Sequence, residues 1–290
     1  MALESCKTIA LEGVIGHIVD IEANIGAGLP GIHVVGRTDT AINESRQRIK
    51  TAIINSQLAW PKTKIVVSLS PASLPKSGAH FDLPLAVAIL LAGMKAQDEQ
   101  LAADGYATWG TESFAEKTAN TLFLGELGLD GSLKPVPGIL SAMVAAPKHG
   151  YHTIVIPPGN AGEAQLVEDT RVLVAHNLRE VFEWLRGNRH LKTPEHIPAP
   201  QRNQTLDFAD IAGQHEAKFA IEVAAAGGHH LMMIGPPGSG KSMLAARIPS
   251  ILPKLSTAQA VESTAIHSIA GSMGEIIAHA PFISPHASLS

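Results

Sequence analysis

Residues 235–242 read Gly-Pro-Pro-Gly-Ser-Gly-Lys-Ser, which fits the pattern G-x-x-x-x-G-K-[ST] of a phosphate-binding loop. Glycines at its first, fourth and sixth positions let the backbone curve tightly and turn N–H groups inward at φ > 0. Lys241 is long enough to reach the β- and γ-phosphates of a nucleoside triphosphate, and the Ser242 hydroxyl is a suitable Mg²⁺ ligand. The candidate cofactor-binding residues are Gly235, Pro236, Pro237, Gly238, Ser239, Gly240, Lys241 and Ser242.

The sequence on either side of this loop supports the motif. Residues 230–234 form an apolar run that predicts a buried strand, and residues 242–248 have helical spacing. A helix that starts at the loop points its unpaired N–H groups at the phosphates. Strand, loop and helix therefore follow in the required order, which favours a phosphate site over a chance glycine-rich connector.

A second glycine pattern, at residues 26–31, also fits a nucleotide motif, G-x-G-x-x-G. Pro30 lies inside it, and the next residues, 32–36, are typical of a strand rather than a helix. A dinucleotide site requires a helix N-terminus at that point. We therefore expect a turn between two strands there.

The composition indicates a folded protein of about two domains. Apolar residues make up 45% of the 290 residues and charged residues 17%, so a packed core is expected. The net charge of −4 provides no general basic surface for nucleic acid. A local basic cluster is interpreted as a solvated helix face; it comprises Arg46, Arg48, Lys50, Lys62 and Lys64.

Other residue types point to a cytoplasmic protein without a membrane partner. Cys6 is the one cysteine, so no disulfide forms within the chain, as suits a reducing compartment. The N-terminus does not resemble a signal peptide, and the apolar stretch from Leu83 to Met94 is too short to cross a bilayer. The 14 histidines show no metal-binding spacing and are interpreted as ordinary surface or core residues.

The order of elements predicts an α/β protein. Residues 1–188 form one mixed domain, residues 189–207 a proline-containing linker, and residues 208–290 a second unit that includes a helix at 216–226 closed by Gly227-Gly228. Residues 95–120 are expected to be rich in loops. The first domain is predicted to have strands at 7–12, 15–25, 32–36, 64–69, 153–156 and 171–175, a hairpin from 122 to 136, and helices at 39–56, 81–93, 138–149, 160–167 and 177–187.

Blocks spread along nearly the whole chain resemble the magnesium-chelatase-like AAA+ ATPases of the YifB/ComM type. The blocks are 28–31, 35–36, 44–46, 60–61, 70–72, 75–78, 81–84, 213–214, 224–229, the phosphate loop and 252–253. The phosphate loop alone is shared by many families. The other blocks make the assignment specific, and together they identify the N-terminal portion of such a protein, ending before the Walker B motif.

The resemblance implies a fold and a function. The first domain would have the ribosomal-protein-S5-like fold also found in Lon-type protease domains, followed by a partial P-loop AAA+ domain. ATP and Mg²⁺ would be the cofactors, with Ile211, Gly213 and Gln214 on the adenine side. The family implies a homo-hexamer and, in its ComM branch, a DNA helicase or branch-migration motor used in competence, so DNA is an implied partner.

Several positions depart from this family pattern, namely Arg37-Thr38, Ser68 and Phe219. Hydrolysis also needs carboxylates that orient magnesium and water. Between Ser242 and Ser290 no apolar run ends in Asp-Glu, and Glu262 and Glu275 are isolated acids. We therefore expect ATP binding without turnover by this chain alone. The alternative is a truncated, non-enzymatic interaction module or a non-functional fragment.

A Lon-like peptidase is a further, less favoured alternative. Such enzymes pair a serine with a lysine, and the amine must lie within hydrogen-bond reach of the hydroxyl. In the matching segment, residues 75–80, His80 stands where the nucleophile would be, and residues 138–143 contain no lysine. We expect no protease activity and a structural role for Lys76 and His80.

Overall fold

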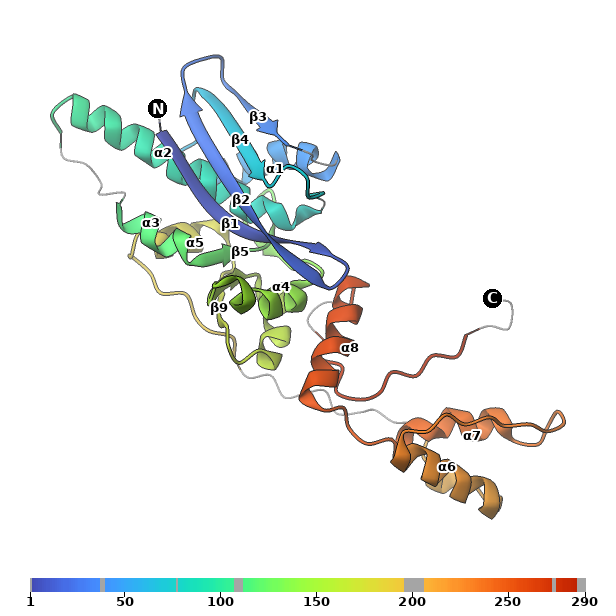
Figure 1. Ribbon diagram of the computed structural model, residues 1–290. Coiled ribbons are helices and arrows are strands. Elements are labelled where there is room, and N and C mark those ends of the chain that lie inside the picture. Colours follow the sequence, from blue (N-terminus) through green and yellow to red (C-terminus); the bar gives the residue numbers. More distant parts are fainter. Residues whose placement is uncertain are drawn as a thin grey trace. The chain divides into compact units, whose positions relative to one another are not determined.

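The computed structural model describes residues 2–36, 40–76, 78–106, 112–195, 206–272 and 275–285 (Figure 1). The chain divides into two compact units. Unit 1 comprises Met1–Ile197 and Thr264–Glu275, and unit 2 comprises Pro198–Ser263 and Ile276–Ser290. The departure at Arg37-Thr38 lies outside the described residues.

Unit 1 is built on a seven-stranded mixed sheet with the strand order β3-β4-β2-β1-β5-β8-β9. β1 pairs antiparallel with β2, and β2 with β4, whereas the four remaining pairs are parallel. The predicted mixed α/β architecture is therefore confirmed. The strands are β1 (Ala2–Glu12), β2 (Ile15–Gly26), β3 (Gly31–Val35), β4 (Lys64–Ser70), β5 (Thr121–Phe123), β8 (Thr153–Ile156) and β9 (Arg171–Val174).

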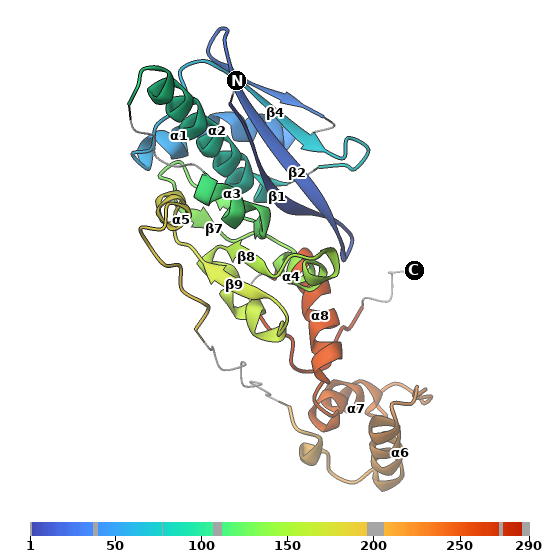
Figure 2. The same cartoon turned by 60° about the vertical axis from the view of Figure 1, so that its left-hand side comes forward.

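Helices pack on both faces of this sheet. Neighbouring residues of a strand point to opposite faces, so one strand contributes to two hydrophobic clusters. Cys6 and Ala10 of β1 belong to one hydrophobic cluster, with α1 (Thr40–Asn55) and α2 (Asp82–Ala103). Ile9 belongs to a second cluster, with α4 (Ile139–Ala145). Figure 2 shows α2 alongside β1 and β2. The other elements of unit 1 are α3 (Glu112–Ala119), α5 (Leu178–Leu185), the hairpin β6 (Glu126–Leu127) and β7 (Leu133–Lys134), and short 3₁₀ helices at Ala79–Phe81, Pro147–His149 and Pro158–Leu166.

The prediction of a loop-rich segment at 95–120 is wrong for most of its length. α2 continues past Gly93 to Ala103, and α3 occupies Glu112–Ala119, while residues 107–111 lie outside the described part of the chain. Gly93 lies inside the helix and packs closely on Pro61; a Cβ there would lie 3.1 Å from Pro61 Cγ, so a small residue suits this position. The polar residues that follow are good helix formers.

The long apolar helix α2 is a core helix. Among the described residues it is the one helix long and apolar enough to span a bilayer, and two-thirds of its most apolar window is buried within the protein. The side chains from Leu83 to Ala92 are all buried. The buried thiol of Cys6 donates to the Pro84 carbonyl at 3.0 Å, and burial raises its pKa well above the usual thiol range.

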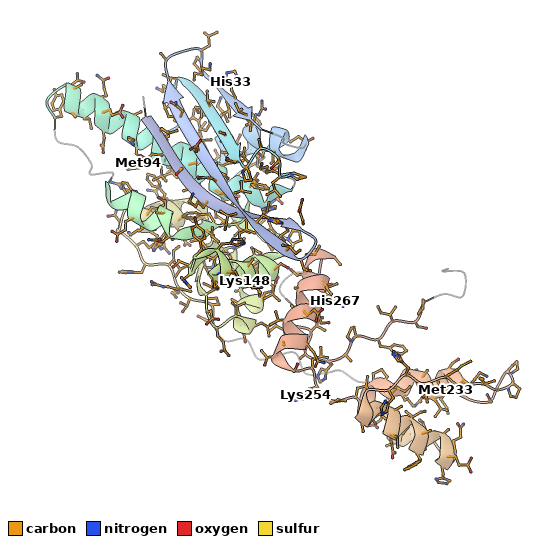
Figure 3. All side chains as sticks on the ribbon, in the orientation of Figure 1. His33, Met94, Lys148, Met233, Lys254 and His267 are labelled. Carbon is orange, nitrogen blue, oxygen red and sulfur yellow. The ribbon has the colours of Figure 1, made fainter. Side chains whose placement is uncertain are left out.

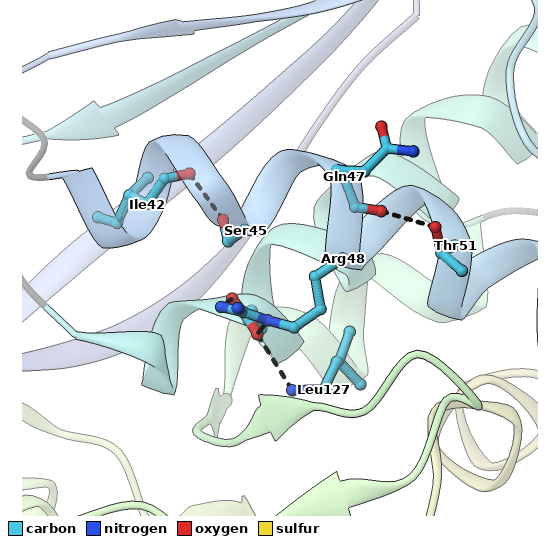
Figure 4. Close-up of polar contacts among 7 residues, drawn as sticks. Ile42, Ser45, Gln47, Arg48, Thr51 and Leu127 are labelled. Atoms are coloured by element: carbon cyan, nitrogen blue, oxygen red, sulfur yellow. Dashed lines mark hydrogen bonds and ion pairs between the residues drawn. The ribbon is translucent and has the colours of Figure 1, made fainter.

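An ion pair joins α1 to the start of α2 (Figure 4). Arg48 Nε donates to Asp82 Oδ2 at 2.6 Å and Arg48 Nη2 donates to Oδ1 at 3.0 Å. The same carboxylate accepts from the Leu127 N–H at 3.1 Å. The Asp82 side chain is fully buried, and this desolvation raises its carboxyl pKa despite the opposing effect of Arg48. Arg48 thus stabilises the contact between the two helices. The interpretation of the basic cluster as a solvated helix face is wrong for this residue.

Unit 2 contains a 3₁₀ turn at Phe208–Asp210, α6 (His215–Gly227), α7 (Lys241–Arg247), a second 3₁₀ turn at Ile248–Ile251 and the first part of α8 (Thr257–Ile269). Gly228 caps α6 in the left-handed conformation, as predicted. The small hydrophobic core of unit 2 consists of Phe208, Ile211, Ile221 and Leu244.

The predicted buried strand at 230–234 is wrong for this structure. These residues form no strand, and the Met232 and Ile234 side chains are 81% and 84% exposed. A strand needs a hydrogen-bonded neighbour. Within the described residues of unit 2 no segment pairs with 230–234, so its apolar side chains have no partner layer to cover them.

Candidate nucleotide site

The phosphate loop of unit 2 leads directly into α7. Gly238 and Gly240 adopt φ values of 82° and 88°, and Gly240 is the N-cap of α7. Both conformations favour glycine. Gly235 is not among the glycines with positive φ, so its role in the loop is close packing: a Cβ there would lie 3.0 Å from Ser239 Oγ. The Ser239 N–H donates to the Pro236 carbonyl at 3.3 Å and tightens the turn.

Lys241 folds back over this loop. Its Nζ donates to the Gly235 carbonyl at 2.7 Å, to the Pro236 carbonyl at 2.8 Å and to Ser239 Oγ at 3.2 Å. The ammonium therefore lies at the concave side of the loop. An oxygen of a bound triphosphate could replace these carbonyls as the acceptor for the Lys241 ammonium. The negatively charged oxygen would accept the stronger hydrogen bond.

The remaining surroundings of the loop fit a nucleotide with magnesium. Ser242 is exposed in the first turn of α7, so its hydroxyl is accessible to a cation. A cavity of about 390 Å³ adjoins the loop, with Lys241 and Ser239 on its polar side. Its apolar side includes Ala217 and Ile221 of α6 and Met233, which is labelled in Figure 3. The polar wall suits the phosphates of a nucleotide, and the apolar wall suits its base.

Residues 211–214 lie next to the phosphate loop. The Ile211 side chain is buried in the small core and its carbonyl accepts from Lys218 Nζ at 2.8 Å, so that side chain supports the unit from inside. Gly213 and Gln214 both have positive φ, at 66° and 50°. The Gln214 side chain lines the same cavity as Lys241. The sequence did not predict that Ala217 and Ala220 of α6 line this cavity, because small size alone does not distinguish a cavity wall from a packed helix face.

The two other sequence features considered for chemistry lie in unit 1. The glycine pattern at 26–31 is the turn between β2 and β3, as predicted. Lys76 is 1% exposed, its Nζ donates to the Pro71 carbonyl, and burial lowers its pKa. The His80 ring packs on Phe81 with 4.2 Å between centroids. Lys76 is thus engaged by the main chain of its own loop, while Ser77 lies outside the described residues.

Comparisons with known proteins place this chain in a family. Two family models match: one described as subunit ChlI of Mg-chelatase over residues 21–160, and one described as magnesium chelatase, subunit ChlI, over residues 207–290. The whole chain is 39% identical to the uncharacterised protein YifB of Escherichia coli and 35% identical to the competence protein ComM of Haemophilus influenzae. The chain belongs to the YifB/ComM group of magnesium-chelatase-like proteins.

The matches to this family cover all of the present chain but only part of each relative. An uncharacterised protein of Mycobacterium tuberculosis is 43% identical over 100% of this chain and 55% of its own length. YifB and ComM are covered over 54% and 55% of their lengths. The chain thus spans about half the length of the curated relatives it matches. A shorter segment, 27% of the chain, is 36% identical to the archaeal Lon protease of Thermoplasma acidophilum.

Proposed function

We propose that this chain binds ATP with Mg²⁺ through residues 235–242. The observation that carries the proposal is the arrangement of Lys241, whose ammonium lies over the concave side of a loop formed by Gly238 and Gly240 at positive φ. The backbone N–H groups of the loop and Lys241 would hold the phosphates, and the Ser242 hydroxyl would ligate Mg²⁺. The bound Mg²⁺ would supply charge neutralisation between the β- and γ-phosphates.

In this proposal the two units belong to one ATP-driven machine. Residues 1–188 form an S5-like domain related to Lon-type protease domains, residues 189–207 a linker, and residues 208–290 the first part of an AAA+ module. The family match at 21–160 supports the first assignment, and the match at 207–290 supports the second.

The process served by this machine is proposed to be DNA remodelling in the cytoplasm, by helicase or branch-migration activity of a homo-hexamer. The likeness to a protein named for competence supports this choice. The net charge of −4 means that DNA contacts would depend on local patches rather than on the whole surface. Matches along the full chain favour this proposal over a stand-alone interaction module.

No peptidase activity is proposed for unit 1. The helix α4, where the lysine of a serine–lysine pair is expected, reads Ile-Leu-Ser-Ala-Met-Val-Ala. Its Leu140 N–H donates to the buried Glu163 carboxylate at 3.0 Å. Lys76 is buried and donates to the Pro71 carbonyl, which suits a role in supporting its loop.

Fluorescence anisotropy with a mant-labelled ATP tests the nucleotide proposal. We expect Mg²⁺-dependent binding by the 290-residue chain and a loss of about tenfold or more in affinity for Lys241→Ala, since hydrogen bonds to charged groups contribute about 1.5–3 kcal/mol. Lys254→Ala is the matched control, because Lys254 is an exposed lysine of the same unit outside the loop (Figure 3).

Two results would count against the proposal. Equal affinities of wild type and Lys241→Ala would show that the loop does not hold the phosphates. Phosphate release that disappears in Lys241→Ala would contradict the expectation that these 290 residues bind ATP without hydrolysing it.

A further inference from the structure

Gln214 has an unusual backbone conformation for its residue type. Among the described residues, two that are not glycine have positive φ: Gln57 at 57° and Gln214 at 50°. The left-handed region is unfavourable for side chains with a Cβ, and glutamine is not one of the residues that visit it routinely. Each of the two therefore needs a local reason.

For Gln57 the reason is the end of a helix. Its N–H donates to the Ile54 carbonyl at 2.9 Å, just after α1, where a left-handed residue commonly closes a helix. Its side chain is held as well, because Gln57 Oε1 accepts from Arg179 Nη1 at 2.8 Å. Gln57 thus serves the packing of unit 1.

Helix capping does not account for Gln214. It precedes α6 rather than following a helix, and N-cap residues normally adopt extended backbone with a side-chain acceptor. Gln214 instead has φ 50° and ψ 44°, and its side chain makes no cap hydrogen bond. Gly213 before it is also left-handed, so two consecutive residues turn the chain sharply at this point.

The turn carries the Gln214 amide to the end of the phosphate loop. A Cβ built on Gly240 would lie 2.7 Å from Gln214 Nε2 and 3.6 Å from Oε1. The amide therefore rests against the Cα of Gly240, the residue directly before Lys241. Glycine is favoured at position 240 by its φ of 88°, and a Cβ there would also displace the Gln214 amide.

We propose that Gln214 is a positioning residue for the phosphate loop. Its amide fixes Gly240 against the start of α6 and so sets the direction in which the loop N–H groups and Lys241 face the phosphates. The left-handed backbone at 213–214 is the conformation that brings the amide there. This inference rests on the proposed binding of ATP at residues 235–242, and it assigns Gln214 to the phosphate end of the nucleotide rather than to the base.

The test compares Gln214→Gly with Gln57→Gly, since each substitution relieves the same backbone conformation and removes an amide. For Gln214→Gly we expect affinity for mant-ATP to fall about two- to tenfold, because the loop would then have to be ordered when the nucleotide binds. Affinity for mant-AMP should change less, and Gln57→Gly should leave both affinities unchanged. Gln214→Asn, which keeps an amide and tolerates the backbone, should recover part of the loss.

Amide hydrogen exchange in ligand-free protein supplies a second measurement that does not depend on ATP. Exchange at residues 239–242 should be faster in Gln214→Gly than in wild type and unchanged in Gln57→Gly. Wild-type exchange and ATP affinity in Gln214→Gly would overturn the inference, as would equal losses for mant-AMP and mant-ATP. If wild type itself binds no mant-ATP, the proposed function fails, and the exchange result still decides whether Gln214 holds the loop.

Discussion

Replacing Arg48 by methionine should destabilise unit 1 strongly, because it leaves the Asp82 carboxylate without its cation. Asp82 is fully buried, and after the substitution its one remaining described donor is the Leu127 N–H at 3.1 Å. Removing one partner of a buried pair costs about 3–5 kcal/mol. The Arg48 side chain is 24% exposed, so we expect the lower end, about 3 kcal/mol. For a unit of this size that corresponds to a Tm lower by about 6–12 °C.

The loss should depend on pH in a defined direction. Burial raises the pKa of Asp82 in the folded protein, so its protonated form is favoured by folding. The contribution of this protonation to the free energy of unfolding is fully present below the pKa of Asp82 in the unfolded chain. It is lost as pH rises through the pKa of Asp82 in the folded protein. Without Arg48 the folded pKa rises further. The deficit of Arg48→Met relative to wild type should therefore be smaller at pH 5 than at pH 8.

Urea unfolding followed by circular dichroism at both pH values measures this deficit. The double variant Arg48→Met/Asp82→Leu is the control, because replacing both partners by apolar groups removes the buried charge. It should be more stable than Arg48→Met alone and should lose the added pH dependence. A deficit that is equal at pH 5 and pH 8, or a double variant as unstable as the single one, would refute the reasoning.

Two glycine substitutions, each with a matched control, test the packing of the turns. Gly131→Ala should lower the thermal stability of unit 1 by about 1–3 kcal/mol, since Gly131 has φ 84° and its Cβ would meet Ser56 Oγ. Gly150→Ala, with φ 82° and nothing within 4 Å, should cost less, and equal Tm values would contradict the steric argument. Gly240→Ala should destabilise ligand-free unit 2 more than Gly238→Ala, because Gly238, at φ 82°, has open space around it. Chemical unfolding monitored by hydrogen exchange of α7 measures the difference, and similar losses would argue against contact with Gln214.

Local patterns predicted the elements whose partners lie nearby or whose faces differ strongly. The alternation from Lys64 to Leu69 gave β4, and Asp130-Gly131 correctly marked the turn between β6 and β7. The extent of α2 could not be read in the same way. Gly93 looks like a helix end in the sequence, whereas in the structure it packs on Pro61 inside the helix, a contact that depends on tertiary packing.

In the candidate site, too, the features that depend on neighbouring residues were predicted, and those that depend on distant contacts were not. The motif predicted the loop and the start of the helix that follows it, because both depend on residues that are neighbours in the sequence. The apolar run at 230–234 gave the wrong secondary structure, since strand formation depends on a distant partner. The contact between Gln214 and Gly240 links residues 26 positions apart through a left-handed backbone, and no periodic pattern reports such a contact.

The single buried cysteine makes thiol labelling a probe of the opening of unit 1. Cys6 is 1% exposed between β1 and α2, and its raised pKa keeps the thiol protonated and unreactive in the folded protein. A thiol reagent can modify it only when the first strand separates from that helix. When the reagent reacts faster than the strand closes again, the rate of labelling equals the rate of opening of unit 1, and no other cysteine in these 290 residues contributes to it.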